Sequence, residues 1–161
     1  MRPSSRELLE GIAVALERQV APAVQDKWAA SVLRSAVQLL GHLGQRVEDE
    51  PRLLREDNAD ARKVLETLAA SIAGGGADAA TLRDAVGDAL AREEPEAWDT
   101  RALAACNESC QSAIELLVRH RELLAQLTGD RAAQSELHGY LQRRLAREQH
   151  LYFPSLLGPP F

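Results

Sequence analysis

The chain has 161 residues and a formal net charge of −5, with acidic and basic side chains interspersed along it. This balance argues against nucleic acid and anionic membranes as partners, because both select a basic face. No apolar run approaches the roughly 18 residues of a membrane span, and the N-terminus lacks the apolar core of a signal peptide. We therefore expect a cytoplasmic protein with residues 1–161 in one domain, burying roughly 70% of its unfolded surface.

Helical periodicity dominates the chain from its first residues. Ser4 and Glu7 have the spacing of a capping box, which predicts the start of the first helix. On one straight helix, the apolar positions before and after Pro22 would point in directions about 200° apart. We therefore expect the chain to turn there, with Pro22 in the first turn of a second helix.

The second helix is expected over about residues 23–48, and Pro51 is expected to end it. Its apolar face spans nearly half of the cylinder, which is typical of a central helix. The residues of this face are Trp28, Val32, Leu33, Ala36, Leu39, Leu40, Leu43 and Val47. The same periodicity predicts a third helix over about 58–73, ended by three glycines at 74–76, and a fourth over about 78–92.

Asp99 is the expected N-cap of the fifth and longest helix, at about residues 100–128. A sixth follows Gly129 and ends near residue 148. No segment shows the alternation of a strand, and short connections make neighbouring helices antiparallel. The predicted fold class is all-α, an up-and-down bundle of about five to six helices over residues 1–150.

An apolar, proline-containing tail at residues 151–161 follows the last predicted helix. Such a segment does not fold alone and would be a sticky patch in water. We expect it to pack on its own bundle, to reach across a homodimer, or to bind another protein. The residues predicted to make this contact are Leu151, Tyr152, Phe153, Leu156, Leu157 and Phe161.

The sequence predicts neither a metal nor a cofactor. A di-iron bundle needs Glu-x-x-His pairs, and none of the four histidines has an acidic residue three positions before it. Cys106 and Cys110 are four residues apart on an apolar stripe. Their Cβ atoms on a helix would be about 5–6 Å apart, beyond the span of a disulfide at about 4 Å. We interpret them as two small core residues.

Two groups of polar residues fall on apolar helix faces and are candidates for a ligand pocket. Asp57 and Asn58 interrupt the stripe between the second and third helices. One of them is either the N-cap of the third helix or part of a polar site with His42. Arg144 and Glu148 lie on the inward side of the sixth helix, where they either meet an anion or extend beyond the bundle into solvent. No catalytic constellation is recognisable, so an enzyme is not expected.

The first 90 or so residues resemble a bacterial family of small helical proteins, often encoded beside aminoglycoside-phosphotransferase-like proteins and acyl-CoA dehydrogenases. The resemblance lies in residues 6–13, in Val20–Val24 around Pro22, and in Leu39–Leu40. It implies an accessory role near such enzymes. The sequence thus favours a non-enzymatic protein-interaction module, forming a homodimer or binding a partner protein. The alternative is a bundle that binds a small ligand or a metal in a polar pocket.

Overall fold

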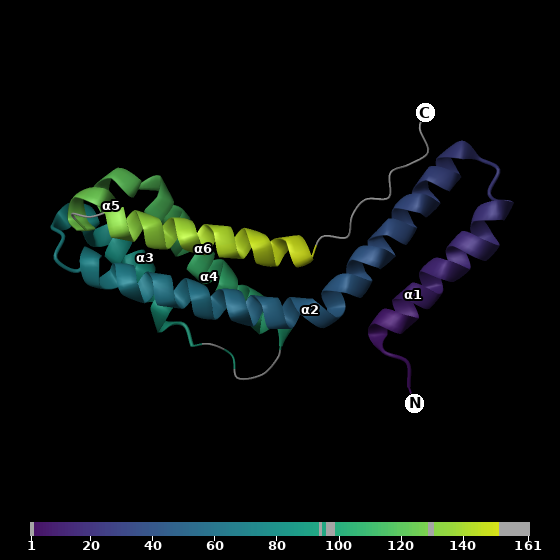
Figure 1. The fold of residues 1–161 in the computed structure, drawn as a ribbon, viewed down its shortest axis with the longest axis horizontal. Coiled ribbons are helices and arrows are strands. Elements are labelled where there is room, and N and C mark those ends of the chain that lie inside the picture. The colour runs from purple at the N-terminus through teal and green to yellow at the C-terminus, as the bar shows by residue number, and fades with distance from the viewer. Residues whose placement is uncertain (1, 94, 96–98, 129–130, 152–161) are drawn as a thin grey trace. The chain divides into compact units, whose positions relative to one another are not determined.

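The computed structural model describes residues 2–93, 95, 99–128 and 131–151, and within these ranges the chain forms six α-helices and no strand (Figure 1). The all-α helical-bundle prediction is therefore confirmed. The chain divides into two compact units. The first comprises residues up to Glu50 together with the end of the last helix from Glu148, and the second is Pro51–Arg147. The single domain predicted for residues 1–161 stays a prediction.

The first unit contains α1 (Ser5–Ala15) and the first half of α2 (Lys27–Ile72). The predicted capping box is confirmed, because the Ser4 hydroxyl accepts from the Glu7 amide and the Glu7 carboxylate accepts from the Ser4 amide. A π-helical turn at Leu16–Val20 and a 3-10 turn at Ala21–Ala23 follow α1. Pro22 is the middle residue of this 3-10 turn, so its predicted place in the second helix is wrong.

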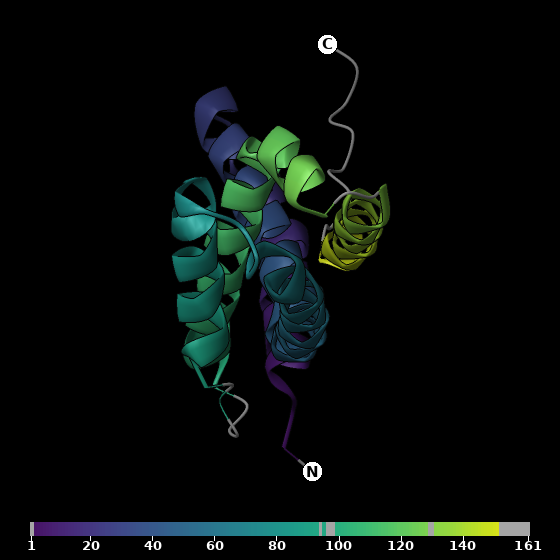
Figure 2. The same ribbon diagram turned by 90° about the vertical axis from the view of Figure 1, so that its left-hand side faces the viewer.

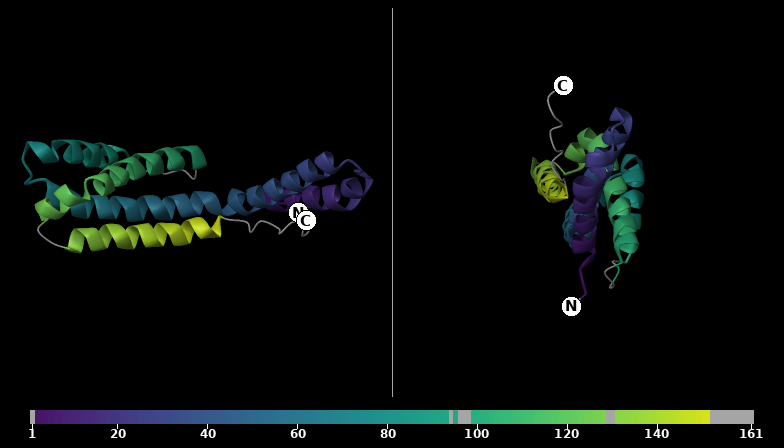
Figure 3. Two further views of the ribbon diagram at one scale, coloured as in Figure 1. Left: turned by 90° about the horizontal axis from the view of Figure 1, so that it is seen from above. Right: turned by 90° about the vertical axis from the view of Figure 1, so that its right-hand side faces the viewer.

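Asp26 caps α2 instead, its Oδ1 accepting from the amide of Ala29 at 2.8 Å. The segment between the 3-10 turn and α2 includes extended backbone at Val24, which confirms that the chain turns in this region. Figure 3 shows α1 beside the first half of α2.

The second and third predicted helices are one helix, α2, with Pro51 in its interior. The prediction that Pro51 ends a helix is therefore wrong. An interior proline loses one backbone hydrogen bond, but ion pairs Arg46–Glu50 and Arg52–Glu56 support the turns on either side of it. Pro51 is also the first residue of the second compact unit.

The second unit comprises the rest of α2, α3 (Ala80–Ala91), α4 (Thr100–Arg119), α5 (Arg121–Thr128) and α6 (Arg131–His150) up to Arg147. Figure 2 shows α3 and α6 on opposite sides of the second half of α2. Asp99 caps α4 as predicted, its side chain accepting from the amides of Arg101 and Ala102. The predicted fifth helix is in fact two helices, because the backbone of His120 departs from helical geometry.

Gly74–Gly76 follow α2 as predicted, with the Gly75 amide donating to the Ile72 carbonyl at 3.0 Å. The requirement for glycine at position 75 is one of space. A Cβ atom there would come within 2.4 Å of the Ala79 Cβ and 2.9 Å of a Leu127 methyl. The close approach of Ala79, just before α3, and of Leu127 on α5 to the turn after α2 therefore depends on Gly75.

The core of the second unit contains buried residues from all five of its helices. Members include Ala61, Val64, Leu65, Leu68 and Ile72 of α2, Leu82 and Val86 of α3, Cys110, Ile114 and Leu117 of α4, Leu124 of α5, and Leu137 and Tyr140 of α6. Cys106 and Cys110 are both buried thiols, which confirms their interpretation as core residues. Burial and the neighbouring Cys106 raise the pKa of Cys110 to about 11. None of the helices in the described ranges is both long enough and apolar enough to cross a bilayer.

Candidate functional site

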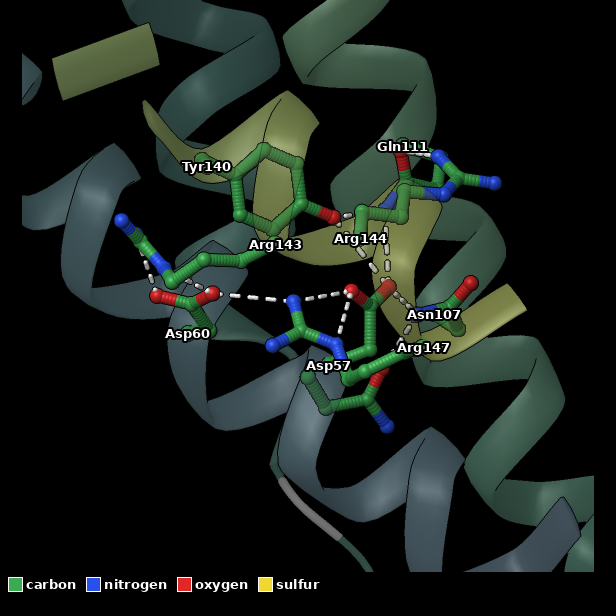
Figure 4. Close-up of polar contacts among 9 residues, drawn as sticks. Asp57, Asp60, Asn107, Gln111, Tyr140, Arg143, Arg144 and Arg147 are labelled. Atoms are coloured by element: carbon green, nitrogen blue, oxygen red, sulfur yellow. Dashed lines mark hydrogen bonds and ion pairs between the residues drawn. The ribbon is translucent and has the colours of Figure 1, made fainter. Parts of the chain in front are cut away.

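Nine polar side chains from three helices of the second unit meet in one network, which we call the polar cluster (Figure 4). Its members are Asp57, Asn58 and Asp60 of α2, Asn107 and Gln111 of α4, and Tyr140, Arg143, Arg144 and Arg147 of α6. Asp57 and Asn58 are only 6% and 0% exposed. A carboxylate in such a place is stable only when its oxygens are fully hydrogen-bonded.

Asp57 has hydrogen bonds to both α4 and α6. Its Oδ1 accepts from Arg147, at 2.7 Å from Nη2 and 3.2 Å from Nε. Its Oδ2 accepts from Asn107 Nδ2 at 2.7 Å, and from Gln111 Nε2 and Tyr140 Oη at 3.1 Å each. The two carboxylate oxygens therefore hold one α6 arginine, one α6 tyrosine and two α4 amides around a single residue of α2.

Asn58 completes the link between α2 and α4. Its Nδ2 donates to the Leu103 carbonyl at 3.0 Å, and its Oδ1 accepts from Asn107 at 2.9 Å. Gln111 donates to the hydroxyl of Tyr140 and accepts from Arg144, which joins α4 to α6. Burial and the nearby carboxylate of Asp57 raise the pKa of Tyr140, so its hydroxyl stays protonated and remains a donor.

Asp60 forms the outer edge of the cluster. Its two oxygens accept from Arg143 at 2.7 and 2.9 Å, and Arg147 adds a contact at 2.9 Å. The hydrogen bond from Arg143 lowers the pKa of Asp60, against an opposing effect of burial and with further help from Arg147. Hydrogen bonds to the charged form have this effect on a carboxylate.

The stability of the protein is expected to fall as the pH drops below about 4, partly because of Asp60. The folded-state pKa of Asp60 lies below its unfolded value of about 3.9. Its contribution is therefore present above that value and lost as the pH falls through the folded pKa. The melting temperature of Asp60→Asn should decline less between about pH 5 and 2 than that of the unmodified protein, because this is the range in which one carboxylate titrates. Equal declines in the two proteins would contradict this.

The polar cluster binds three helices of the chain to one another. No buried side-chain nitrogen or oxygen among the described residues lacks a hydrogen-bond partner. In the same part of the chain, no three histidine, cysteine or acidic residues are grouped as metal ligands. The apolar contact of α6 is thin, since Leu137 and Tyr140 are buried but Leu141 and Leu145 are exposed. We conclude that the cluster holds α6 in place, with a geometry more specific than apolar packing would give.

The structure brings together three of the five predicted pocket residues, Asp57, Asn58 and Arg144. His42 and Glu148 belong to the first unit. The N-cap interpretation of Asp57 and Asn58 is wrong, because α2 runs through both and their side chains bond to other helices. Of the predicted tail contact, only the half-buried Leu151 is described. Tyr152, Phe153, Leu156, Leu157 and Phe161 lie outside the described residues.

Sequence reasoning missed six members of the cluster: Asp60, Asn107, Gln111, Tyr140, Arg143 and Arg147. Asn107 and Gln111 are four residues apart on α4, next to its buried cysteines. Arg143 and Arg147 have the same spacing on α6. Pairs at this spacing share a helix face, and the acidic pair on α2 matches the two arginines in charge. This charge match was the one feature of the sequence that could have predicted the contact between α2 and α6.

A second candidate site is an apolar surface in the first unit. Five large apolar side chains in one line along α2 are between 45% and 82% exposed. With two exposed residues of α1 they form what we call the apolar face: Leu8 and Ile12 of α1, and Trp28, Val32, Leu39, Leu43 and Val47 of α2. Within the described part of the chain, the prediction that this part of α2 is a central, covered helix is therefore wrong.

The packing of α1 explains why this surface is left uncovered. α1 covers the side of α2 that carries Leu40 and the buried Gly44, where a Cβ on Gly44 would lie 3.9 Å from the Leu9 Cβ. At 100° per residue, the line from Trp28 to Val47 is about 110° around α2 from that side. One helix cannot cover both sides, so the line stays exposed.

The two helices of the first unit also enclose a groove of about 310 Å³, which has a mixed lining. Polar side chains of α1 (Arg6 and Glu10), of the π-helical turn that follows it (Glu17) and of α2 (Gln38 and Gln45) contribute to it. None of the seven residues of the apolar face is among its lining residues. The groove and the apolar face are therefore different surfaces of the same helix pair.

Comparison with known proteins adds no assignment, since no family model, curated protein or solved structure matches the chain.

Proposed function

We propose that the chain is a non-enzymatic protein-interaction module that binds its partner through the apolar face. The observation that carries this proposal is the exposure of the α2 line, above all of Trp28 at 82%. Tryptophan is enriched among the residues that dominate binding energy. Large contiguous apolar patches on a protein surface mark interaction sites.

The area is large enough to support binding. The exposed fractions of the seven side chains correspond to apolar surface on the order of 800 Å², and its burial would contribute roughly 20 kcal/mol before costs. Association costs about 4–15 kcal/mol in lost freedom of motion. An area of this size per partner is typical of standard, specific protein interfaces, although affinity also depends on how well the residues pack.

The polar cluster supports the same function from the other unit. Its carboxylates and amides are hydrogen-bonded to arginines and amides of the chain itself. We therefore interpret the polar cluster as a structural element of the second unit and not as a reactive site. The resemblance of the first 90 residues implies an accessory role, and an exposed binding surface is what such a role requires.

Site-specific photo-cross-linking in cells that express the full chain tests the proposal. A photoreactive amino acid replaces Val32 or Leu39 on the apolar face, or Arg34, which is exposed about 190° around α2 from the centre of the face. We expect adducts with protein, either a copy of the chain or another protein, from positions 32 and 39 only. Equal adduct yields from position 34, or no adducts from any position, would overturn the proposal.

A further inference from the structure

We propose that the partner of the apolar face is a second copy of this chain, bound antiparallel so that two α1–α2 helix pairs form a four-helix bundle. This inference rests on the proposed function and adds the identity and orientation of the partner. Four features support it: the geometry of the apolar face, the pairing of its side chains, the charge at its two ends, and its area.

The exposed lines of α1 and α2 lie on one side of the helix pair. α1 turns Leu9 and Ala13 toward α2, and its exposed Leu8 and Ile12 lie about 100° back around the helix from them. On α2 the exposed line lies about 110° around the helix from the side that contacts α1. When each helix is viewed from its own N-terminus, the two exposed lines are rotated from the contact in the same direction. Two antiparallel helices are related by a two-fold axis perpendicular to the plane that contains them. Equal rotations in the same direction therefore place both exposed lines on the same face of the helix pair.

The groove confirms this geometry. Its polar lining residues, such as Glu10 on α1 and Gln38 and Gln45 on α2, lie on the other side of the α1–α2 contact from the apolar face. They therefore lie on the far side of the helix pair. One side is mixed and hollowed, and the other is apolar. A two-helix layer with one apolar side is half of a four-helix bundle.

The α2 line is self-complementary when it is reversed. A two-fold axis midway between Trp28 and Val47 sets each of them against the other in the second copy. The same axis pairs Val32 with Leu43, and Ala36 with Leu39. Each pair joins a larger and a smaller side chain, as close packing of facing layers requires. The steps of four, three and four residues from Val32 to Leu43 are those of a coiled-coil seam.

The charges favour the antiparallel orientation over the parallel one. The first end of the line carries Lys27 and the positive end of the helix dipole beside the capping Asp26. The last end carries three consecutive acidic residues, 48–50, with Arg46. A parallel pair would set the two acidic ends together, whereas an antiparallel pair sets each one near the start of the partner's α2. Opposed like charges would disfavour the parallel pair.

The buried area matches a stable homodimer. The apolar face exposes on the order of 800 Å² per copy, and a standard interface buries about 800 Å² from each partner. The same patch on both copies gives a closed two-fold interface, which is the commonest symmetry among soluble oligomers. A second copy therefore covers the whole exposed surface with no further component.

Sedimentation velocity on the purified full chain, over a wide concentration range, tests the second copy as partner. We expect a dimer that dissociates on dilution. Leu39→Glu should weaken dimerisation by about a hundredfold or more, because it sets like charges against each other near the two-fold axis. Arg34→Glu, on the opposite side of the same helix, should leave the dissociation constant within about threefold, since a charge outside the interface acts weakly. Circular dichroism checks that both variants stay folded.

Disulfide trapping tests the orientation. The full chain carrying both Trp28→Cys and Val47→Cys should give covalent dimers on mild oxidation, whereas Trp28→Cys alone should not. Covalent dimers from Trp28→Cys alone would overturn the antiparallel arrangement. Monomers at every concentration would overturn the second copy as partner. If position 32 then still cross-links another protein in cells, the proposed function stands without this inference, and if it cross-links none, both fail.

Discussion

Replacement of Asp57 by alanine is expected to lower the free energy of unfolding of the second unit by about 3–5 kcal/mol. The carboxylate is 6% exposed and accepts hydrogen bonds from Arg147, Tyr140 and two α4 amides. Its removal leaves buried donors without their acceptor, which costs their full desolvation. Chemical denaturation at fixed protein concentration measures the loss.

Asp88→Ala provides the matched control. Asp88 is exposed on α3 in the same unit, so the same substitution there should change stability by no more than about 0.5 kcal/mol. If the two variants lose equal stability, the polar cluster contributes nothing specific. A double-mutant cycle with Arg147→Ala isolates the ion pair, because the effects of contacting residues are not additive.

Hydrogen exchange locates the effect of Asp57→Ala within the fold. α6 is held by few apolar contacts, with Leu141 and Leu145 exposed, and by arginines that contact Asp57 and Asp60. Amides of α6 should therefore lose protection before those of α3, which packs against α4 through Leu82 and Val86. Uniform loss of protection across the second unit would indicate general destabilisation instead.

The helices themselves were largely predictable from the sequence because their signals are local. The Ser4 capping box, the Asp99 N-cap and the glycines after Ile72 depend on residues a few positions apart. The same locality explains the error at Pro51. A proline's cost to a helix is a local quantity, whereas the helix around it is also stabilised by tertiary contacts of residues such as Leu53 and Asp57.

Only some members of the polar cluster could be predicted from the sequence. Asp57 and Asn58 were recognised as polar residues on an apolar face. Their partners Asn107 and Arg147, however, lie 50 and 90 positions further along the chain. Periodicity places a residue on a face of its own helix but does not say which other helix that face meets. His42 was proposed as a partner for the same reason, and the structure assigns it to the other unit.

The apolar face shows a different limit of sequence reasoning. The wide stripe on the second predicted helix was correctly recognised as apolar and was interpreted as the mark of a central helix. Hydrophobic spacing indicates that a surface is suited to burial, and it does not distinguish burial within the chain from burial against another molecule. Only the exposure of Trp28 and Leu39 in the folded chain separates the two.

Leu65→Ala is expected to have a similarly large effect, lowering the free energy of unfolding by about 3–5 kcal/mol. Leu65 is 0% exposed on α2, between Ala61 and Leu68 in the core of the second unit. Its truncation removes apolar contacts and leaves a cavity that close-packed neighbours fill only in part. Leu145→Ala is the control, since Leu145 is 58% exposed on α6 and should cost no more than about 0.5 kcal/mol. Equal losses would show that Leu65 is not in a packed core.

Leu65→Ala and Leu39→Glu together test whether the two units of the chain unfold separately. Leu65 lies in the second unit, and Leu39 lies on the apolar face of the first unit. If the units unfold separately, Leu65→Ala should shift only the transition that is independent of protein concentration, because the proposed dimerisation of the first unit would make the stability of that unit depend on concentration. Leu39→Glu should abolish that concentration dependence and leave the other transition unchanged. A single transition that both variants shift equally would mean that the two units fold as one cooperative body.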